Sequence, residues 1–84
     1  MFYMIRAEQM SARLLDEVVQ GIEDQRRGSV YGYGMDSEFT GFANMIVQAT
    51  PGNRDAICAM FQDQNGGAYC KAQAMTEEEL DEYL

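Results

Sequence analysis

The chain contains no histidine. This absence removes the side chain most suited to general-base catalysis near neutral pH, and with it the Ser–His and Cys–His pairs of many nucleophilic enzymes. It also leaves no imidazole for a zinc site, and two cysteines cannot complete a four-ligand zinc shell within one chain. We therefore expect no catalytic residue, no metal and no cofactor, and we predict a protein that is not an enzyme.

Cysteine is scarce as well. Cys58 and Cys70 are the only two in 84 residues, too few for the disulfide framework of many small secreted domains. We interpret them as reduced core residues. Oxidised together, they would close a loop of roughly a dozen residues and add about 3 kcal/mol to the free energy of unfolding.

Long hydrophobic runs are also missing, so no segment has the length of a membrane span. The apolar start stops at Arg6 and lacks both the basic lead and the long apolar stretch of a secretion signal. These absences predict a cytoplasmic protein that does not bind membranes. With 84 residues the chain is expected to form one domain, residues 1–84, of modest stability.

Basic residues are outnumbered, six against 14 acidic ones, and the formal net charge is −8. The excess is concentrated at the C-terminus: residues 1–75 hold nine acids and six bases, whereas residues 76–84 hold five acids and no base. This distribution disfavours direct binding to a long nucleic acid. It favours a protein partner with a basic surface, because opposite charges steer association.

Helical periodicity dominates what remains. Apolar side chains recur at helical spacing over residues 8–25, 36–49 and 50–65, and an acidic fourth helix follows over residues 76–84. We predict a mainly α fold, a compact small bundle of about four helices that leaves room for a minor two- or three-stranded sheet; an α+β fold is the runner-up. The candidate strands are residues 2–6, 29–33 and 68–73, and the predicted core is Ile5, Leu14, Leu15, Val18, Val19, Ile22, Phe39, Phe42, Ile46, Ile57, Met60, Phe61 and Leu80.

Local signals mark the expected helix ends. Gly28 follows two arginines and is typical of a left-handed helix stop. Thr50 and Pro51 predict a capped helix start, because proline fits the first helical position. Thr76 and Glu79 have the spacing of a capping box, in which each side chain satisfies the other residue's backbone amide.

The acidic C-terminal helix is the first candidate for a binding site. Its apolar edge, formed by Leu80, Tyr83 and Leu84, would enter a groove while the acids meet basic side chains at the rim. The second candidate is the segment 26–34, because tyrosine and arginine, here Tyr31, Tyr33 and Arg27, are enriched at interfaces and the glycines let them adapt. Each candidate has a purely structural alternative, which stays open. For the first it is a last helix that is only solvated, and for the second it is a connector whose tyrosines pack on the core. The predicted partner-binding residues are Glu77, Glu78, Asp81, Glu82, Tyr83, Tyr31 and Tyr33.

The functional interpretation is a small, acidic, non-enzymatic protein-binding module. Its carboxylates would take the place of phosphates on a nucleic-acid-handling protein and inhibit it. In size and charge alone, it is comparable with phage-encoded anti-restriction and anti-CRISPR inhibitors. Two alternatives stay open: a protein that sequesters a small nucleotide with Arg26, Arg27, Tyr31 and Tyr33, and a structural subunit of a homo-oligomer.

Overall fold

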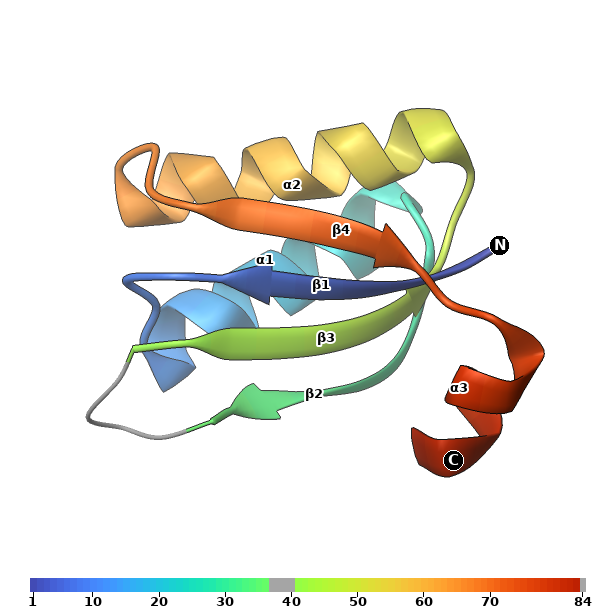
Figure 1. The fold of residues 1–84 in the computed structure, drawn as a ribbon. Helices are drawn as coiled ribbons and strands as arrows, with labels where there is room; N and C mark the ends of the chain where they lie inside the picture. The colour runs from blue at the N-terminus through green and yellow to red at the C-terminus, as the bar shows by residue number, and fades with distance from the viewer. Residues whose placement is uncertain (37–40, 84) are drawn as a thin grey trace.

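A four-stranded antiparallel sheet organises the protein, in the strand order β2-β3-β1-β4. The computed structural model describes residues 1–36 and 41–83. The first six elements follow the β-α-β-β-α-β order of the ferredoxin-like arrangement, which many unrelated functions share. The elements are β1 (Phe2–Ala7), α1 (Ala12–Gln25), β2 (Ser29–Met35), β3 (Ala43–Gln48), α2 (Pro51–Asn65), β4 (Cys70–Ala74) and α3 (Glu77–Tyr83) (Figure 1).

The predicted four-helix bundle is wrong, and the protein has an α+β fold. Within the predicted helix over residues 36–49, Ala43–Gln48 form strand β3, and Gly41 before it has a left-handed φ of 68°. A short apolar run fits both a helix and a doubly covered strand, and the β-branched pair Ile46 and Val47 favours the strand. The candidate strands at residues 2–6, 29–33 and 68–73 are β1, β2 and β4 of a full sheet.

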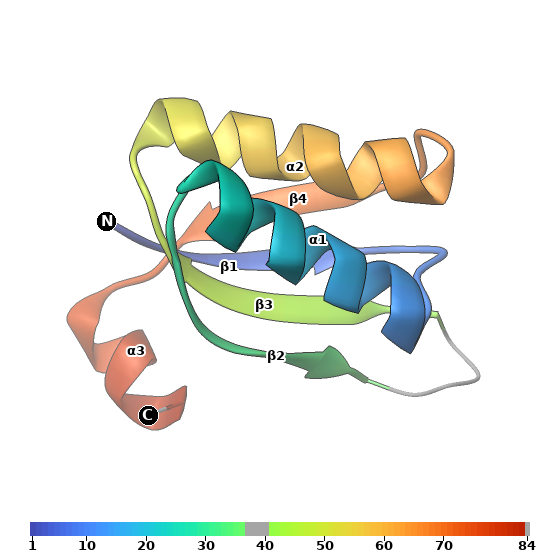
Figure 2. The same cartoon turned by 180° about the vertical axis from the view of Figure 1, so that it is seen from behind.

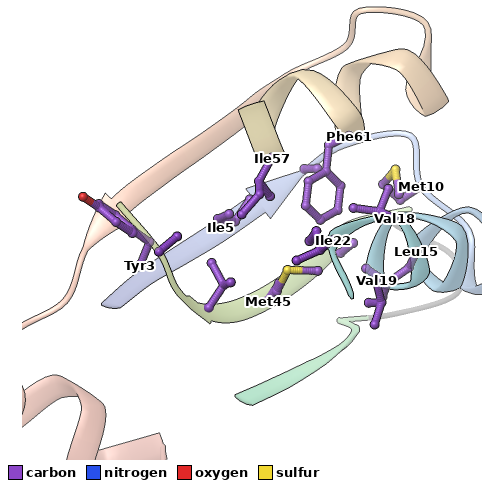
Figure 3. Packing of buried hydrophobic residues seen from close by; sticks show 14 residues of the cluster. Tyr3, Ile5, Met10, Leu15, Val18, Val19, Ile22, Met45, Ile57 and Phe61 are labelled. Carbon is purple, nitrogen blue, oxygen red and sulfur yellow. The ribbon is translucent and has the colours of Figure 1, made fainter. Parts of the chain in front are cut away.

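Helices α1 and α2 cover the same face of this sheet, whereas α3 lies on the other side of it (Figures 1 and 2). The core lies between the two helices and the sheet. Phe61 of α2 is fully buried and points toward Val18 and Ile22 of α1 (Figure 3). We call the face opposite α1 and α2 the open face.

The predicted core is confirmed for the residues of α1 and α2 that face the sheet. Leu14 and Met60 are only partly buried, Phe39 lies outside the described residues, and Ile46 is buried without joining the core cluster. Tyr3 and Met45 were missed because their strands were not predicted as central. The buried members predicted correctly are Ile5, Leu15, Val18, Val19, Ile22, Ile57 and Phe61.

Most helix ends match their local signals. The Thr50 hydroxyl accepts a hydrogen bond from the Asn53 amide at 3.2 Å, and α2 starts at the proline that follows the threonine. Helix α1 begins later than residue 8, after the Ser11 cap, and ends at Arg26 with a φ of 53° rather than at Gly28. No helix within residues 1–36 and 41–83 is long and apolar enough to cross a membrane.

Candidate protein-docking surface

The N-terminus of helix α3 is capped by residues of the same segment. The Thr76 hydroxyl accepts a hydrogen bond from the Glu79 amide, and the Glu79 carboxylate accepts one from the Thr76 amide, both at 3.1 Å. The predicted capping box is therefore confirmed. It uses one of the five acids and leaves the four predicted binding acids, Glu77, Glu78, Asp81 and Glu82, exposed to solvent.

These four carboxylates have no cationic partner among the described residues, whose only ion pairs involve Asp36 and Asp55. None of the residues of α3 within Glu77–Tyr83 is buried, and Leu80 is only half-buried. The segment before the helix is fixed by one backbone hydrogen bond, from the Met75 amide to the Phe2 carbonyl at 2.9 Å. Helix α3 is thus an attached element with little packing, and its acids face outward.

Tyr83 is the side chain of α3 that meets the open face. It borders a hollow of about 280 Å³ whose floor includes Met4 and Ile46. The hollow exists because Gly32 and Gly34 of β2 carry no side chain on this face, and a Cβ at either position would meet no heavy atom within 4 Å. Tyr83 itself is 62% exposed, so a partner can still reach it.

The two other predicted tyrosines lie on β2, close to this hollow. Tyr33 borders the hollow together with Tyr83. Tyr31 packs edge-to-face on Phe2, with the ring centroids 5.2 Å apart, and its hydroxyl donates to the side-chain oxygen of Gln48 at 3.2 Å. Tyr31, packed on Phe2, therefore lies on the open face with α3, whereas Tyr33 pairs with the core residue Met45 and its side chain points to the helix-covered face.

Sequence reasoning missed a second hollow, of about 300 Å³, on the other side of Tyr83. It is bordered by Arg6 and Lys71, which are directly paired neighbours on β1 and β4. Arg6 is engaged already: its guanidinium pairs with Asp36 at 2.9 Å and lies 4.4 Å from the centroid of the Phe42 ring. Strand register alone brings these bases together, so spacing in the sequence gave no signal for them.

The residues of the nucleotide alternative do not line one hollow. Arg26 and Arg27 border a hollow of about 450 Å³ at the end of α1, together with Met1 and Thr50. The Arg27 side chain donates hydrogen bonds to the side-chain oxygens of Gln25 and Asn53, both at 3.3 Å. Among the residues described, the lining of this hollow does not include either tyrosine of the prediction.

Comparison with protein-family models gives no match, and comparison with curated proteins gives none either.

Proposed function

We propose that this chain is a non-enzymatic protein-binding module that docks on a basic surface of its partner through α3 and the neighbouring tyrosines. The observation that carries the proposal is the mismatch between the composition of α3 and its role in the fold. The helix buries none of its described residues, yet it displays four unpaired carboxylates beside an exposed Tyr83. Burial and capping need only Thr76, Glu79 and the apolar edge.

Charge sets the kind of partner. Exposed carboxylates gain little from a single ion pair in water, but a group of them attracts a basic surface and speeds encounter at low salt. Salt screens this attraction over about 8 Å at physiological ionic strength, so affinity is expected to fall as salt rises. A basic protein surface is the complement of α3.

The tyrosines and the hollow supply the short-range part of the proposal. Tyrosine is enriched among the residues that dominate interface energies, especially beside pockets that exclude water. Tyr83 and Tyr33 border the same hollow, and its floor of Met4 and Ile46 is apolar. An apolar side chain of the partner would occupy this hollow while its bases meet the carboxylates of α3.

The size of α3 limits what it replaces. Seven helical residues span about 10 Å, which is the length of about three phosphates along one nucleic-acid strand. The proposed action is therefore local obstruction of a nucleic-acid-handling protein at a basic site, with the helix covering a few phosphate positions. Mimicry of a whole duplex would need acids over a much longer face.

Charge reversal in the full chain tests the proposal. The partner is first captured from host lysate after nuclease treatment, identified by mass spectrometry, purified and titrated at low and high salt. Replacing Glu78, Asp81 and Glu82 by lysine is expected to weaken its affinity at low salt by at least about tenfold and to remove most of the salt dependence.

A matched control separates local charge from net charge. Asp16, Glu17 and Glu23 are exposed on α1, and reversing them to lysine changes the net charge by the same amount. This control is expected to change the affinity by less than about threefold. Equal losses in both variants, or no loss in the α3 variant, would contradict docking through α3.

Nucleotide sequestration is the second candidate function, and one observation favours it. Two arginines border the hollow at the end of α1, next to the capped start of α2. A bound nucleotide would raise the melting temperature, and Arg27→Gln would remove that rise. A nucleotide panel without any shift would count against this candidate.

Self-association is the remaining alternative. Strand β2 lies at the edge of the sheet and has one unpaired side, which a second copy can use for strand pairing. Sedimentation at several protein concentrations distinguishes this alternative from the other two, because only self-association gives a mass that grows with concentration.

A further inference from the structure

The two cysteines meet where α2 packs on β4. Cys58 lies one turn after Arg54, whose guanidinium is 5.3 Å from the centroid of the Tyr3 ring in β1, and one turn before the buried Phe61. This places Cys58 on the side of α2 that faces the sheet. Helix α2 and strand β4 run side by side along this edge of the sheet (Figure 1).

Cys70 approaches from the strand. It opens β4 opposite Ala7 of β1, which is fully buried on the helix-covered face, so the Cys70 side chain points toward α2. Cys70 packs against the core cluster. The two side chains thus face each other where α2 packs on β4, and both residues are half-buried, so a small reagent has access to the pair.

The two thiols differ chemically. Hydrogen bonding from the Cys70 thiol lowers the pKa of Cys58 to about 7; burial and Asp55 oppose this shift, and Arg54 contributes to it. The same hydrogen bond raises the pKa of Cys70 well above the usual thiol range. Near neutral pH, a large fraction of Cys58 is therefore in the thiolate form, whereas Cys70 remains protonated.

We propose that Cys58 and Cys70 are a redox-active dithiol, which a small-molecule disulfide such as oxidised glutathione converts to an intramolecular disulfide joining α2 to β4. Cys58 is the attacking thiol and Cys70 the resolving thiol. The proposal is independent of docking through α3, because neither cysteine borders the hollows beside Tyr83.

The reaction consists of two thiol–disulfide exchanges. In the first, the Cys58 thiolate attacks one sulfur of oxidised glutathione: a Cys58–glutathione S–S bond forms, the glutathione S–S bond breaks, and one glutathione thiolate leaves. In the second, the Cys70 thiol loses its proton and attacks the Cys58 sulfur, and the other glutathione leaves as thiolate. The protein dithiol is oxidised by two electrons and one glutathione disulfide is reduced to two thiols.

The first exchange prepares the second. The proton of Cys70 is held by the negative charge on the Cys58 sulfur. Once Cys58 is bonded to glutathione, that charge is gone and Cys70 can ionise at a lower pH. The order of attack therefore follows from the direction of the hydrogen bond, and it predicts different products from the two single variants.

The product closes a loop that contains the turn at Gly66 and Gly67 and ties the edge strand β4 to α2. Closing a loop of this length restricts the unfolded chain, so the oxidised protein is expected to melt at least about 10 °C higher than the reduced protein.

Intact-mass spectrometry of the full chain tests the proposal. Reduced protein is incubated with oxidised glutathione at neutral pH, and the reaction is stopped with acid. The wild type is expected to lose about 2 Da without retaining glutathione. Cys70→Ser is expected to stop at a single glutathione adduct, because the resolving thiol is missing. Cys58→Ser is expected to react at least about tenfold more slowly than Cys70→Ser.

The wild-type result decides the proposal even if a variant folds poorly. A wild-type chain that keeps glutathione, forms only disulfide-linked dimers, or remains reduced would overturn the intramolecular disulfide. Single variants that react with glutathione at equal rates would overturn the assigned roles of Cys58 and Cys70.

Discussion

Helices α2 and α3 start alike and end up in different surroundings. Each begins at a capping threonine, Thr50 or Thr76. Helix α2 then buries Ile57 and Phe61 against the sheet, whereas α3 within Glu77–Tyr83 buries no residue. A local start signal is thus enough to begin a helix, but it does not decide whether the helix belongs to the core. Among the acids of α3, Glu79 closes the cap, and Glu77 and Glu78 lie in the first turn, where they favour the positive end of the helix dipole; none of them holds α3 to the core.

The same contrast separates the two faces of the sheet. The helix-covered face is closed by the side chains of α1 and α2, and the open face keeps hollows on both sides of Tyr83. Stability is therefore expected to depend on the covered face and binding on the open face.

The largest effect is expected in the covered face. Replacing Phe61 by alanine removes a fully buried ring and is expected to lower the free energy of unfolding by about 3–5 kcal/mol. Tyr83→Ala, on the open face, is expected to change it by less than about 0.5 kcal/mol. Urea unfolding followed by circular dichroism measures both. If Tyr83→Ala lowered the free energy of unfolding as much as Phe61→Ala does, stability would not depend mainly on the covered face.

A smaller, pH-dependent effect on the free energy of unfolding is expected from Cys58 and Cys70, which also lie on the covered face. In the folded protein the pKa of Cys58 is lowered to about 7 and that of Cys70 is raised, whereas both thiols titrate near about 8.5 when the chain unfolds. Between about pH 7 and 8.5 the unfolded state binds more protons, so the contribution of the pair to stability rises with pH; above about 8.5 the folded state binds more, and the contribution falls.

This pH dependence is isolated by comparison with the variant in which Cys58 and Cys70 are both alanine. Under reducing conditions, the difference in unfolding free energy between wild type and this variant is expected to pass through a maximum near about pH 8.5. The nearest other charges, Arg54 and Asp55, are present in both proteins. A difference that stays constant across this pH range would contradict the asymmetric thiol pair.

The open face offers a substitution that separates stability from binding. Gly34→Val adds a strand-favouring side chain at a position with free space, so it is expected to raise the free energy of unfolding by about 0.5–1 kcal/mol. The new side chain would fill the hollow beside Tyr83 and weaken partner binding by about tenfold. Thr50→Ser, remote from the hollow, serves as the binding control. If the Gly34→Val variant binds the partner as tightly as the wild type, the hollow does not contribute to partner binding.

The sequence predicted those parts of the fold that depend on neighbouring residues. The cap at Thr50, the following proline and the box of Thr76 with Glu79 act within one turn, and the structure confirms them. The inward residues of α1 and α2 were also predictable, because helical periodicity identifies one face of each helix.

The strands could not be assigned in the same way. Phe42, Ala43 and Ile46 have helical spacing, yet this segment continues into the central strand β3, most of whose residues are buried. In β2, the alternation of Gly32 and Gly34 with larger residues was a period-two signal that the weak strand preference of glycine obscured. The pairing of β3 with β1 and with β2 decides both cases, and pairing is a long-range property.

The candidate site shows the same limit. The acids and tyrosines could be chosen from composition, since they form local clusters in the sequence. The position of Tyr33 and Tyr83 at one hollow, and the pairing of Arg6 with Lys71, depend on strand register and on the path of the chain after β4. Candidate residues could therefore be chosen by type from the sequence, and the shape of the surface could not be predicted.

The most direct test of the account compares the full chain with residues 1–75 in two assays on the same preparations. Because α3 buries no residue within Glu77–Tyr83, removing it is expected to change the free energy of urea unfolding by less than about 1 kcal/mol and to weaken partner binding by at least about tenfold. A truncated chain that binds as tightly as the full chain, or that loses several kcal/mol of stability, would contradict the central claim that α3 serves a partner and not the fold.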